Sequence, residues 1–225
     1  MRTFSVPFTA MLLSLFAVFS FADEPKAEFS LNAGIALPTG STSDVQKNSF
    51  SVDGQALWKV HDIVQVGGEL GYMFGSKQEG TIPGNLVGDI DGSGSPSPLA
   101  FTSDIDARIL HLTPEIKVGP TIDLSGIKLN PFVIGGGGFY WTHYTAGTLT
   151  LIGTTSSGIS LNGATVAEDS ANNYNGGWNV GGGLSVQLPK NCAIGFDVRY
   201  HRIMYKGTDD VTFVIPSARL TLLFQ

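Results

Sequence analysis

Residues 177–202 read GWNVGGGLSVQLPKNCAIGFDVRYHR, and two features of this stretch decide the fold. On both sides of the short turn at 189–191, apolar residues alternate one for one with polar residues or glycine. A repeat of two residues is typical of a β-strand with unlike faces, whereas a helix repeats near 3.6 residues. The stretch therefore predicts two antiparallel strands joined by a tight turn.

The same alternation recurs along the chain and predicts eight strands. Their approximate ranges are 28–38, 50–60, 63–74, 109–118, 129–143, 177–188, 192–202 and the last residues from 217 onward. Pro114 lies within the fourth of them, and because proline cannot donate to a ladder we expect a bulge there. In residues 129–143 both the odd-numbered and the even-numbered positions are rich in apolar residues, so the sequence does not show which face of this strand points outward.

The connections between these strands alternate in length. Long connections are expected at 39–49, 75–108, 144–176 and 203–211, and shorter ones at 61–62, 119–128 and 189–191. In outer-membrane barrels the long loops face the outside and the short turns face the periplasm. This alternation of long and short connections predicts an all-β, eight-stranded antiparallel up-and-down transmembrane β-barrel, with both termini periplasmic.

The first residues are typical of a secretory signal. Arg2 supplies a positive start, Val6 to Phe21 an apolar run, and Ser20-Phe21-Ala22 a cleavage pattern, so we expect a signal peptide at 1–22 and a barrel domain at 23–225. Beyond Ala22 no apolar run reaches the roughly 18 residues that a membrane-spanning helix needs. A membrane location then requires a closed barrel.

The charge and the cysteine content exclude some functions. The whole chain has a formal charge of −6, and loss of Arg2 with the leader makes it −7. That acidity argues against nucleic acid, which binds basic patches. The lone Cys192 cannot form an internal disulfide, and we expect no redox role for it.

The polar face of the strands suits the inside of a narrow barrel. A secreted lipocalin-like barrel would instead turn its apolar face inward around a ligand. The polar face here is rich in glycine, which suits a narrow lumen, and it carries both signs of charge. We expect a network that plugs the lumen, formed by Glu69, Glu115, Lys117, Asp197, Arg199, His201 and Arg219.

Aromatic residues lie near the strand ends on the apolar face. Aromatic rings form girdles at both interfaces of a membrane barrel. The expected girdle consists of Trp58, Tyr72, Phe74, Trp178, Tyr200 and Phe224.

Several short motifs strengthen the membrane interpretation. They are Leu31-Asn32-Ala33-Gly34, Gly67-Gly68-Glu69-Leu70-Gly71-Tyr72, Pro131-Phe132-Val133, Phe196-Asp197-Val198-Arg199-Tyr200 and Arg219-Leu220-Thr221-Leu222-Leu223-Phe224. With them the chain resembles the small eight-stranded outer-membrane barrels of Gram-negative bacteria, the group of the OmpA transmembrane domain, OmpX and OmpW. Gln225 departs from that group, whose members usually end on an aromatic residue.

The resemblance implies a structural or surface-interaction role, adhesin-like, through long extracellular loops. Expected partners are outer-membrane lipid and lipopolysaccharide, the barrel-assembly machinery, and host or cell-surface ligands. OmpW-like passive uptake of small hydrophobic molecules is the alternative.

Some barrels of this size are lipid-modifying enzymes, a third and less favoured alternative. Such enzymes use a histidine, a serine and an acid near the outer rim. His143 is the rim candidate here, with Ser156, Ser157 and Glu168 in the following loop. Serine-rich loops commonly offer such a set, so we expect no enzyme and no cofactor.

A calcium-like motif begins at Asp89. Asp89, Asp91 and Ser93 match the opening of a calcium loop, but Ala100 stands where the closing glutamate belongs. We therefore expect no dedicated metal site, and at most weak surface binding of calcium.

Overall fold

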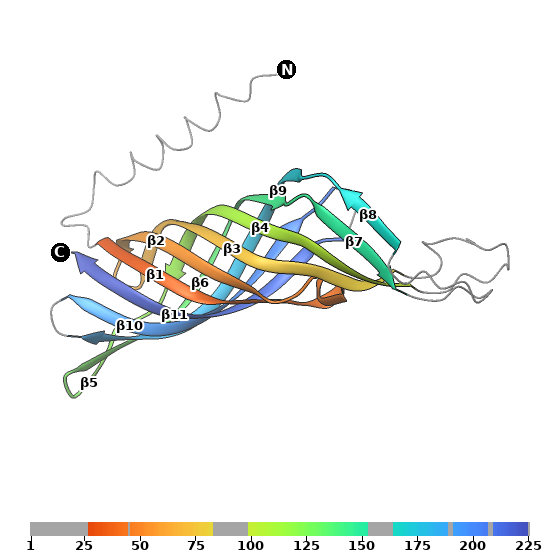
Figure 1. Cartoon of the computed structure of the whole chain (residues 1–225). Coiled ribbons are helices and arrows are strands. Elements are labelled where there is room, and N and C mark those ends of the chain that lie inside the picture. Colours follow the sequence, from red (N-terminus) through yellow and green to blue (C-terminus); the bar gives the residue numbers. More distant parts are fainter. Residues whose placement is uncertain are drawn as a thin grey trace, which may run out of the picture.

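The computed structural model describes residues 27–44, 46–82, 99–152, 164–188, 191–206 and 209–224. Eight of their strands form a closed antiparallel barrel, shown in Figure 1. Each strand pairs with its neighbours, β4 pairs with β6, and β11 pairs with β1 to close the ring. The barrel strands are β1 (Ala27–Pro38), β2 (Ser49–His61), β3 (Val64–Ile82), β4 (Leu99–Val118), β6 (Ile127–Tyr144), β9 (Ala171–Leu188), β10 (Cys192–Met204) and β11 (Val211–Phe224).

The predicted up-and-down barrel is therefore confirmed. The predicted signal peptide lies outside the described residues. Within the described ranges no helix is long and apolar enough to cross a membrane.

Three short strands and one helical turn add to the barrel. These are β5 (Ile122–Leu124), β7 (Gly147–Ile152), β8 (Ala164–Glu168) and the 3-10 helix η2 (Gly40–Asp44). A two-residue turn joins β5 to β6, and both of its residues, Ser125 and Gly126, have positive φ angles of 53° and 92°. Turns of this kind match the twist of a tight hairpin. The connection predicted as a short turn at 119–128 is thus partly a hairpin of its own.

One wall of the barrel is taller than the other. The strands β3, β4, β6 and β9 have 18 to 20 residues, whereas β1, β2, β10 and β11 have 12 to 14. The tall wall continues sideways because β7 pairs with β4 and β8 pairs with β7. Figure 1 shows this extension at the end of the barrel opposite the start of β1 and the end of β11.

The extension corrects the expected loops. Residues 75–82 and 99–108 were assigned to one loop but continue β3 and β4, and β7, β8 and the start of β9 occupy part of 144–176. Apolar and polar residues still alternate in the upper part of β4, but the apolar side chains there point inward. Phe101, Ile105 and Ala107 are buried inside, while Thr102 and Asp104 are exposed outside. Water in place of lipid outside the wall explains this inversion.

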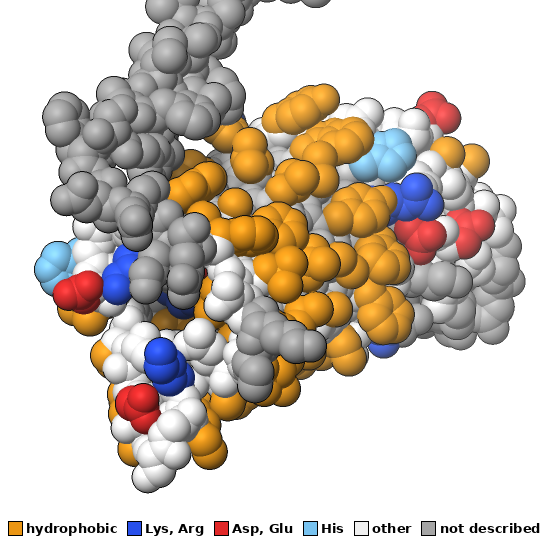
Figure 2. Space-filling model, turned by 90° about the vertical axis from the view of Figure 1, so that its left-hand side faces the viewer, with side chains coloured by type: hydrophobic (Ala, Val, Ile, Leu, Met, Phe, Trp, Pro, Cys, Tyr) orange, Lys and Arg blue, Asp and Glu red, His pale blue; other side chains and the backbone are white. Residues whose placement is uncertain are grey.

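The two faces of each barrel strand are unlike. Outward-facing Leu31, Leu70 and Phe196 are 51%, 55% and 58% exposed, whereas inward-facing Thr113 and Asp197 are buried. Figure 2 shows the consequence, a broad field of hydrophobic side chains on the exterior with charged side chains on either side of it. The apolar face therefore lies outside and the polar face inside.

The structure corrects one prediction made from the sequence and answers one question that the sequence left open. The bulge expected at Pro114 is absent, because Gly68 pairs with Pro114 in an unbroken register. The faces of β6 are now assigned: Ile134 and Tyr140 point into the barrel, and Phe139 points outward.

Candidate functional site: the lumen and the outer end

Arg199 is the centre of the buried charge network. Its guanidinium hydrogen-bonds to Glu69, and it lies 3.0 Å from Glu115 Oε1 and 3.1 Å from Asp197 Oδ2. These four side chains come from β3, β4 and β10, which lie around one level of the lumen. A buried charge is tolerated when it is paired and hydrogen-bonded.

A second set of charges continues toward the end of the barrel that holds the termini. Arg219 lies 3.3 Å from Asp197 Oδ2 and 3.1 Å from Glu28 Oε1, and it also donates to Gln55. Lys117 donates to Glu28 at 2.7 Å. The two sets share Asp197, so the network is continuous across the lumen.

The structure brings six of the seven predicted lumen residues into this network. His201, the seventh, is buried at the same inner face, where its Nδ1 lies 3.1 Å from the Tyr140 hydroxyl. The sequence list omitted several members, among them Glu28, Asp53, Gln55 and His111. All four share the inward parity of their strands, and this signal identifies them.

A compact subset lies on three adjacent strands. His111 Nε2 of β4 is 3.1 Å from Glu69 Oε1 of β3 and 3.7 Å from Asp53 Oδ1 of β2. The His111 ring also packs against Tyr140 and His201, with centroids 5.3 Å and 5.2 Å away. All these side chains are almost wholly buried.

Two apolar clusters accompany the network. Toward the end with the termini, Leu57, Phe132 and Ile134 form a small cluster, and Lys117 stacks over the Phe132 ring at 4.6 Å. Toward the opposite end a larger cluster spans six strands, with members Ala36, Met73, Ile109, Tyr140, Ile203, Phe213 and Ile215. Buried charged and apolar side chains therefore fill the lumen together.

One pocket opens at the end of the barrel where Ala27 and Phe224 lie. It has a volume of about 230 Å³ and is lined by Glu28, Lys117 and Phe132 among others. Its inner lining belongs to the charge network and to the smaller apolar cluster, so it ends against filled lumen.

The predicted girdle residues lie outward at two levels. Trp58 and Phe224 both pair with Ala27, at the end with the termini. Tyr72 stacks on Phe74 with centroids 5.7 Å apart, nearer the other end. The remaining two rings, Trp178 and Tyr200, pack against each other with centroids 5.5 Å apart.

The sequence missed other rings on the outer half. Trp141 stacks on Tyr174, with centroids 6.5 Å apart, and Phe50 packs against Phe74. Trp141 lies in the glycine-rich strand whose faces the sequence did not assign.

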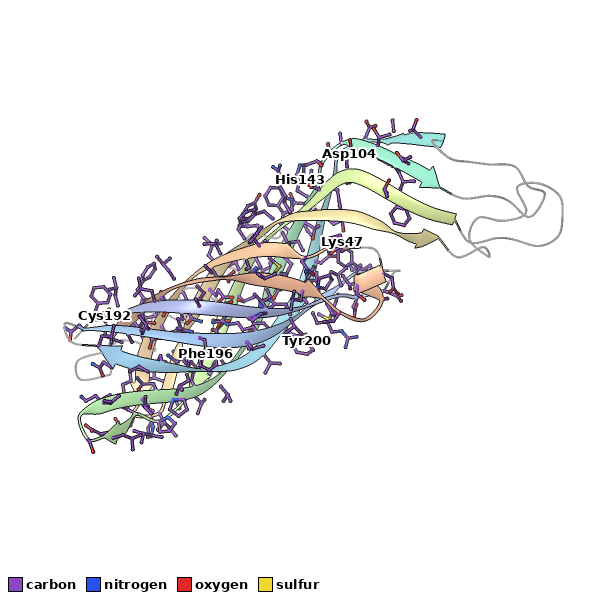
Figure 3. All side chains as sticks on the ribbon, turned by 60° about the horizontal axis from the view of Figure 1, so that its bottom comes forward. Lys47, Asp104, His143, Cys192, Phe196 and Tyr200 are labelled. Carbon is purple, nitrogen blue, oxygen red and sulfur yellow. The ribbon has the colours of Figure 1, made fainter. Side chains whose placement is uncertain are left out.

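The catalytic and calcium candidates are only partly described. Figure 3 places His143 and Asp104 at the extended end and Cys192 at the opposite end. His143 Nδ1 lies 2.9 Å from Asn172 Oδ1. Glu168 ends β8 and is exposed. Ser156 and Ser157, and likewise Asp89, Asp91 and Ser93, lie outside the described residues.

A closed barrel with an apolar belt outside and a filled polar lumen defines the class of integral outer-membrane β-barrels. Residues 8–218 match the family described as "Outer membrane protein beta-barrel domain", and the chain belongs to that family. Its location is the bacterial outer membrane.

Solved structures with similar chains are outer-membrane barrels as well. Neisserial surface protein A is 12% identical with a TM-score of 0.48, and the match covers 90% of this chain and 100% of that one. Ail, the attachment invasion locus protein of Yersinia pestis, is 13% identical with a TM-score of 0.47 and the same coverage. The N-terminal barrel of Pseudomonas aeruginosa OprF is 11% identical with a TM-score of 0.45, covering 89% of this chain and 100% of that one. No curated protein matches the chain.

Proposed function

We propose that this protein is a non-conducting outer-membrane barrel that presents its tall wall to the exterior as a binding surface for host or cell-surface ligands. The observation that carries the proposal is that side chains fill the lumen while the tall wall extends beyond it. Buried charged and apolar side chains occupy the bore, so little space remains for transport. The strands β3, β4, β6 and β9 nevertheless extend well beyond the 9 to 11 residues or so that cross the hydrocarbon.

The proposal places both termini in the periplasm. Ala27 pairs with Phe224, so the two ends of the described chain meet at one end of the barrel. The tight turn at 61–63 and the β5–β6 hairpin lie at that same end. Short turns face the periplasm in barrels of this kind, which leaves the β7–β8 extension outside.

Passive uptake of small hydrophobic molecules is less favoured, because the larger apolar cluster closes the outer half of the bore. A lipid-modifying activity is not proposed. His143 hydrogen-bonds to Asn172, and its expected serine partners lie outside the described residues.

An adherence assay tests the binding role. Tyr144 and Ala171 are cross-strand partners, so residues 145–170 can be replaced by Asn-Gly, which suits a tight hairpin. We expect a non-adherent bacterium expressing the intact protein to bind cultured epithelial cells, and the shortened variant to lose that binding while still migrating as a folded barrel.

A matched control shortens the β5–β6 hairpin at the opposite end. Deleting the paired residues Asp123–Leu124 and Ile127–Lys128 shortens β5 and keeps the Ser125–Gly126 turn. This control should adhere as well as the intact protein. Adherence no greater than that of the empty vector, or adherence kept by the variant lacking residues 145–170, would refute the proposed role.

A further inference from the structure

Three potential metal ligands converge inside the barrel. Asp53, Glu69 and His111 each offer one ligand atom, and these atoms lie within 4.8 Å of one another. They come from three neighbouring strands, β2, β3 and β4. Imidazole nitrogen with carboxylate oxygen is a ligand set that suits divalent transition metals, zinc among them.

Gly71 creates the space in which these groups meet. It lies directly across from Asp53 in one ladder and from His111 in the other. A Cβ atom at this position would collide with Asp53 Oδ1 and with His111 Nε2. The carboxylate and the imidazole therefore converge over the one backbone position between them that has no side chain.

The carboxylates of Asp53 and Glu69 each accept hydrogen bonds from a further side chain. Ser51 Oγ donates to the two oxygens of Asp53 at 3.0 Å and 3.1 Å. Arg199 donates to Glu69 Oε2 and leaves Oε1 turned toward His111. Partners of this kind orient the ligands of a metal and fix their positions.

Counted as fully ionised, the buried charges of the lumen carry a net negative excess. Among the described residues, five buried carboxylates face three permanent cations, which leaves an excess of two negative charges when both buried histidines are neutral. Uncompensated charge inside a membrane protein is costly. A divalent cation would compensate the excess. The members of this count are Glu28, Asp53, Glu69, Glu115, Asp197, Lys117, Arg199 and Arg219.

A buried amide lies at the same level. Asn32 is 2% exposed and pairs directly with Asp53 across the β1–β2 ladder. Neither its Oδ1 nor its Nδ2 has a hydrogen-bond partner among the described residues. An unpaired buried amide is rare and calls for an explanation. Its oxygen is of the type that binds a cation.

We propose that Asp53, Glu69 and His111 bind one divalent transition-metal ion, of the zinc type, inside the lumen, with Asn32 beside the site as a further oxygen donor. The ion takes the place of the hydrogen between His111 Nε2 and Glu69 Oε1, and the neutral His111 ring then carries its single proton on Nδ1. The bound metal joins β1, β2, β3 and β4 at the level of the charge network.

Cobalt provides a direct test, because Co²⁺ occupies zinc sites and its visible absorption reports the ligands. The full chain is refolded into detergent micelles with Co²⁺, and excess metal is removed. We expect one Co²⁺ per folded chain, a visible ligand-field spectrum, and displacement by Zn²⁺. Folded wild-type protein without bound Co²⁺ would overturn the proposal.

Two near-isosteric variants locate the site. Asp53→Asn and His111→Gln should each lower the Co²⁺ affinity at least about tenfold, as expected for a ligand, with folding checked by heat-modifiable migration on a gel. Unchanged affinity in both would overturn the proposal.

A third variant tests whether the metal binds to histidines outside the lumen. His61 ends β2 and is exposed, and His143 lies near the end of β6, so the double variant His61→Gln/His143→Gln leaves the lumen untouched. It should bind Co²⁺ as the wild type does. Loss of binding in this variant would assign the metal to the surface and overturn the lumen site.

Discussion

Arg199 and Arg202 lie on opposite faces of β10 and show how much position decides the role of a charge. Arg199 points into the lumen and contacts Glu69, Glu115 and Asp197. Arg202 points outward, where its side chain is 47% exposed and pairs with Asp210. The same residue type is thus a buried hub in one place and a surface ion pair three residues later.

This contrast gives a prediction at the residue scale. Arg199→Met leaves three buried carboxylates without their shared cation, and breaking a buried pair costs about 3–5 kcal/mol. Arg202→Met should cost less than about 1 kcal/mol, because exposed ion pairs contribute little. Urea unfolding in lipid vesicles, followed by tryptophan fluorescence, measures both. Equal losses in the two variants would contradict the network.

The element scale is illustrated by two neighbouring glycines of β3. Gly67 points into the barrel, and a Cβ there would lie 2.9 Å from Leu57 Cα of the adjacent strand. Gly68 points outward, where a Cβ would keep ordinary contact at 3.4 Å from the Thr113 carbonyl. The inward glycine therefore permits close strand approach in a narrow lumen.

The second prediction follows from that difference. Gly67→Ala should lower the free energy of unfolding by about 1–3 kcal/mol, the usual cost of overpacking. Gly68→Ala should change it by less than about 1 kcal/mol. The same urea titration compares them. A Gly68→Ala variant that is the less stable of the two would show that the assigned faces of β3 are wrong.

The strands inside the membrane could be predicted from sequence, because lipid outside and polar groups inside impose opposite demands on successive residues. The upper strands could not be predicted in the same way. At Phe101, Ile105 and Ala107 the apolar face turns inward, so a search for outward apolar residues ends too early.

The lumen site was partly visible in the sequence. Inward parity identified Glu69, Glu115 and Arg199 as charges of one lumen, because parity alone decides which side of a strand faces inward. Parity does not give the level along the bore, which depends on strand stagger. The convergence of Asp53, Glu69 and His111 over Gly71 depends on two registers and has no short motif.

At the scale of the whole molecule the barrel has two unlike ends. The start of β1, the end of β11 and the β5–β6 hairpin lie together, and the tall wall with β7 and β8 lies opposite. The proposed orientation puts the tall end outside the cell.

Cysteine labelling tests that orientation. In a Cys192→Ser background, Glu168→Cys is placed on β8 and Lys128→Cys on the β5–β6 hairpin, both at exposed positions. A membrane-impermeant maleimide added to intact cells should label the first variant and spare the second until the outer membrane is permeabilised. The reverse pattern would mean that the barrel is inserted the other way.

The central claim is that the barrel is closed, and single-channel recording in planar lipid bilayers tests it most directly. Purified wild-type protein, inserted in its folded form, should give no discrete current steps, because buried charged and apolar side chains fill the lumen. Reproducible open-channel steps from the folded barrel would contradict the account.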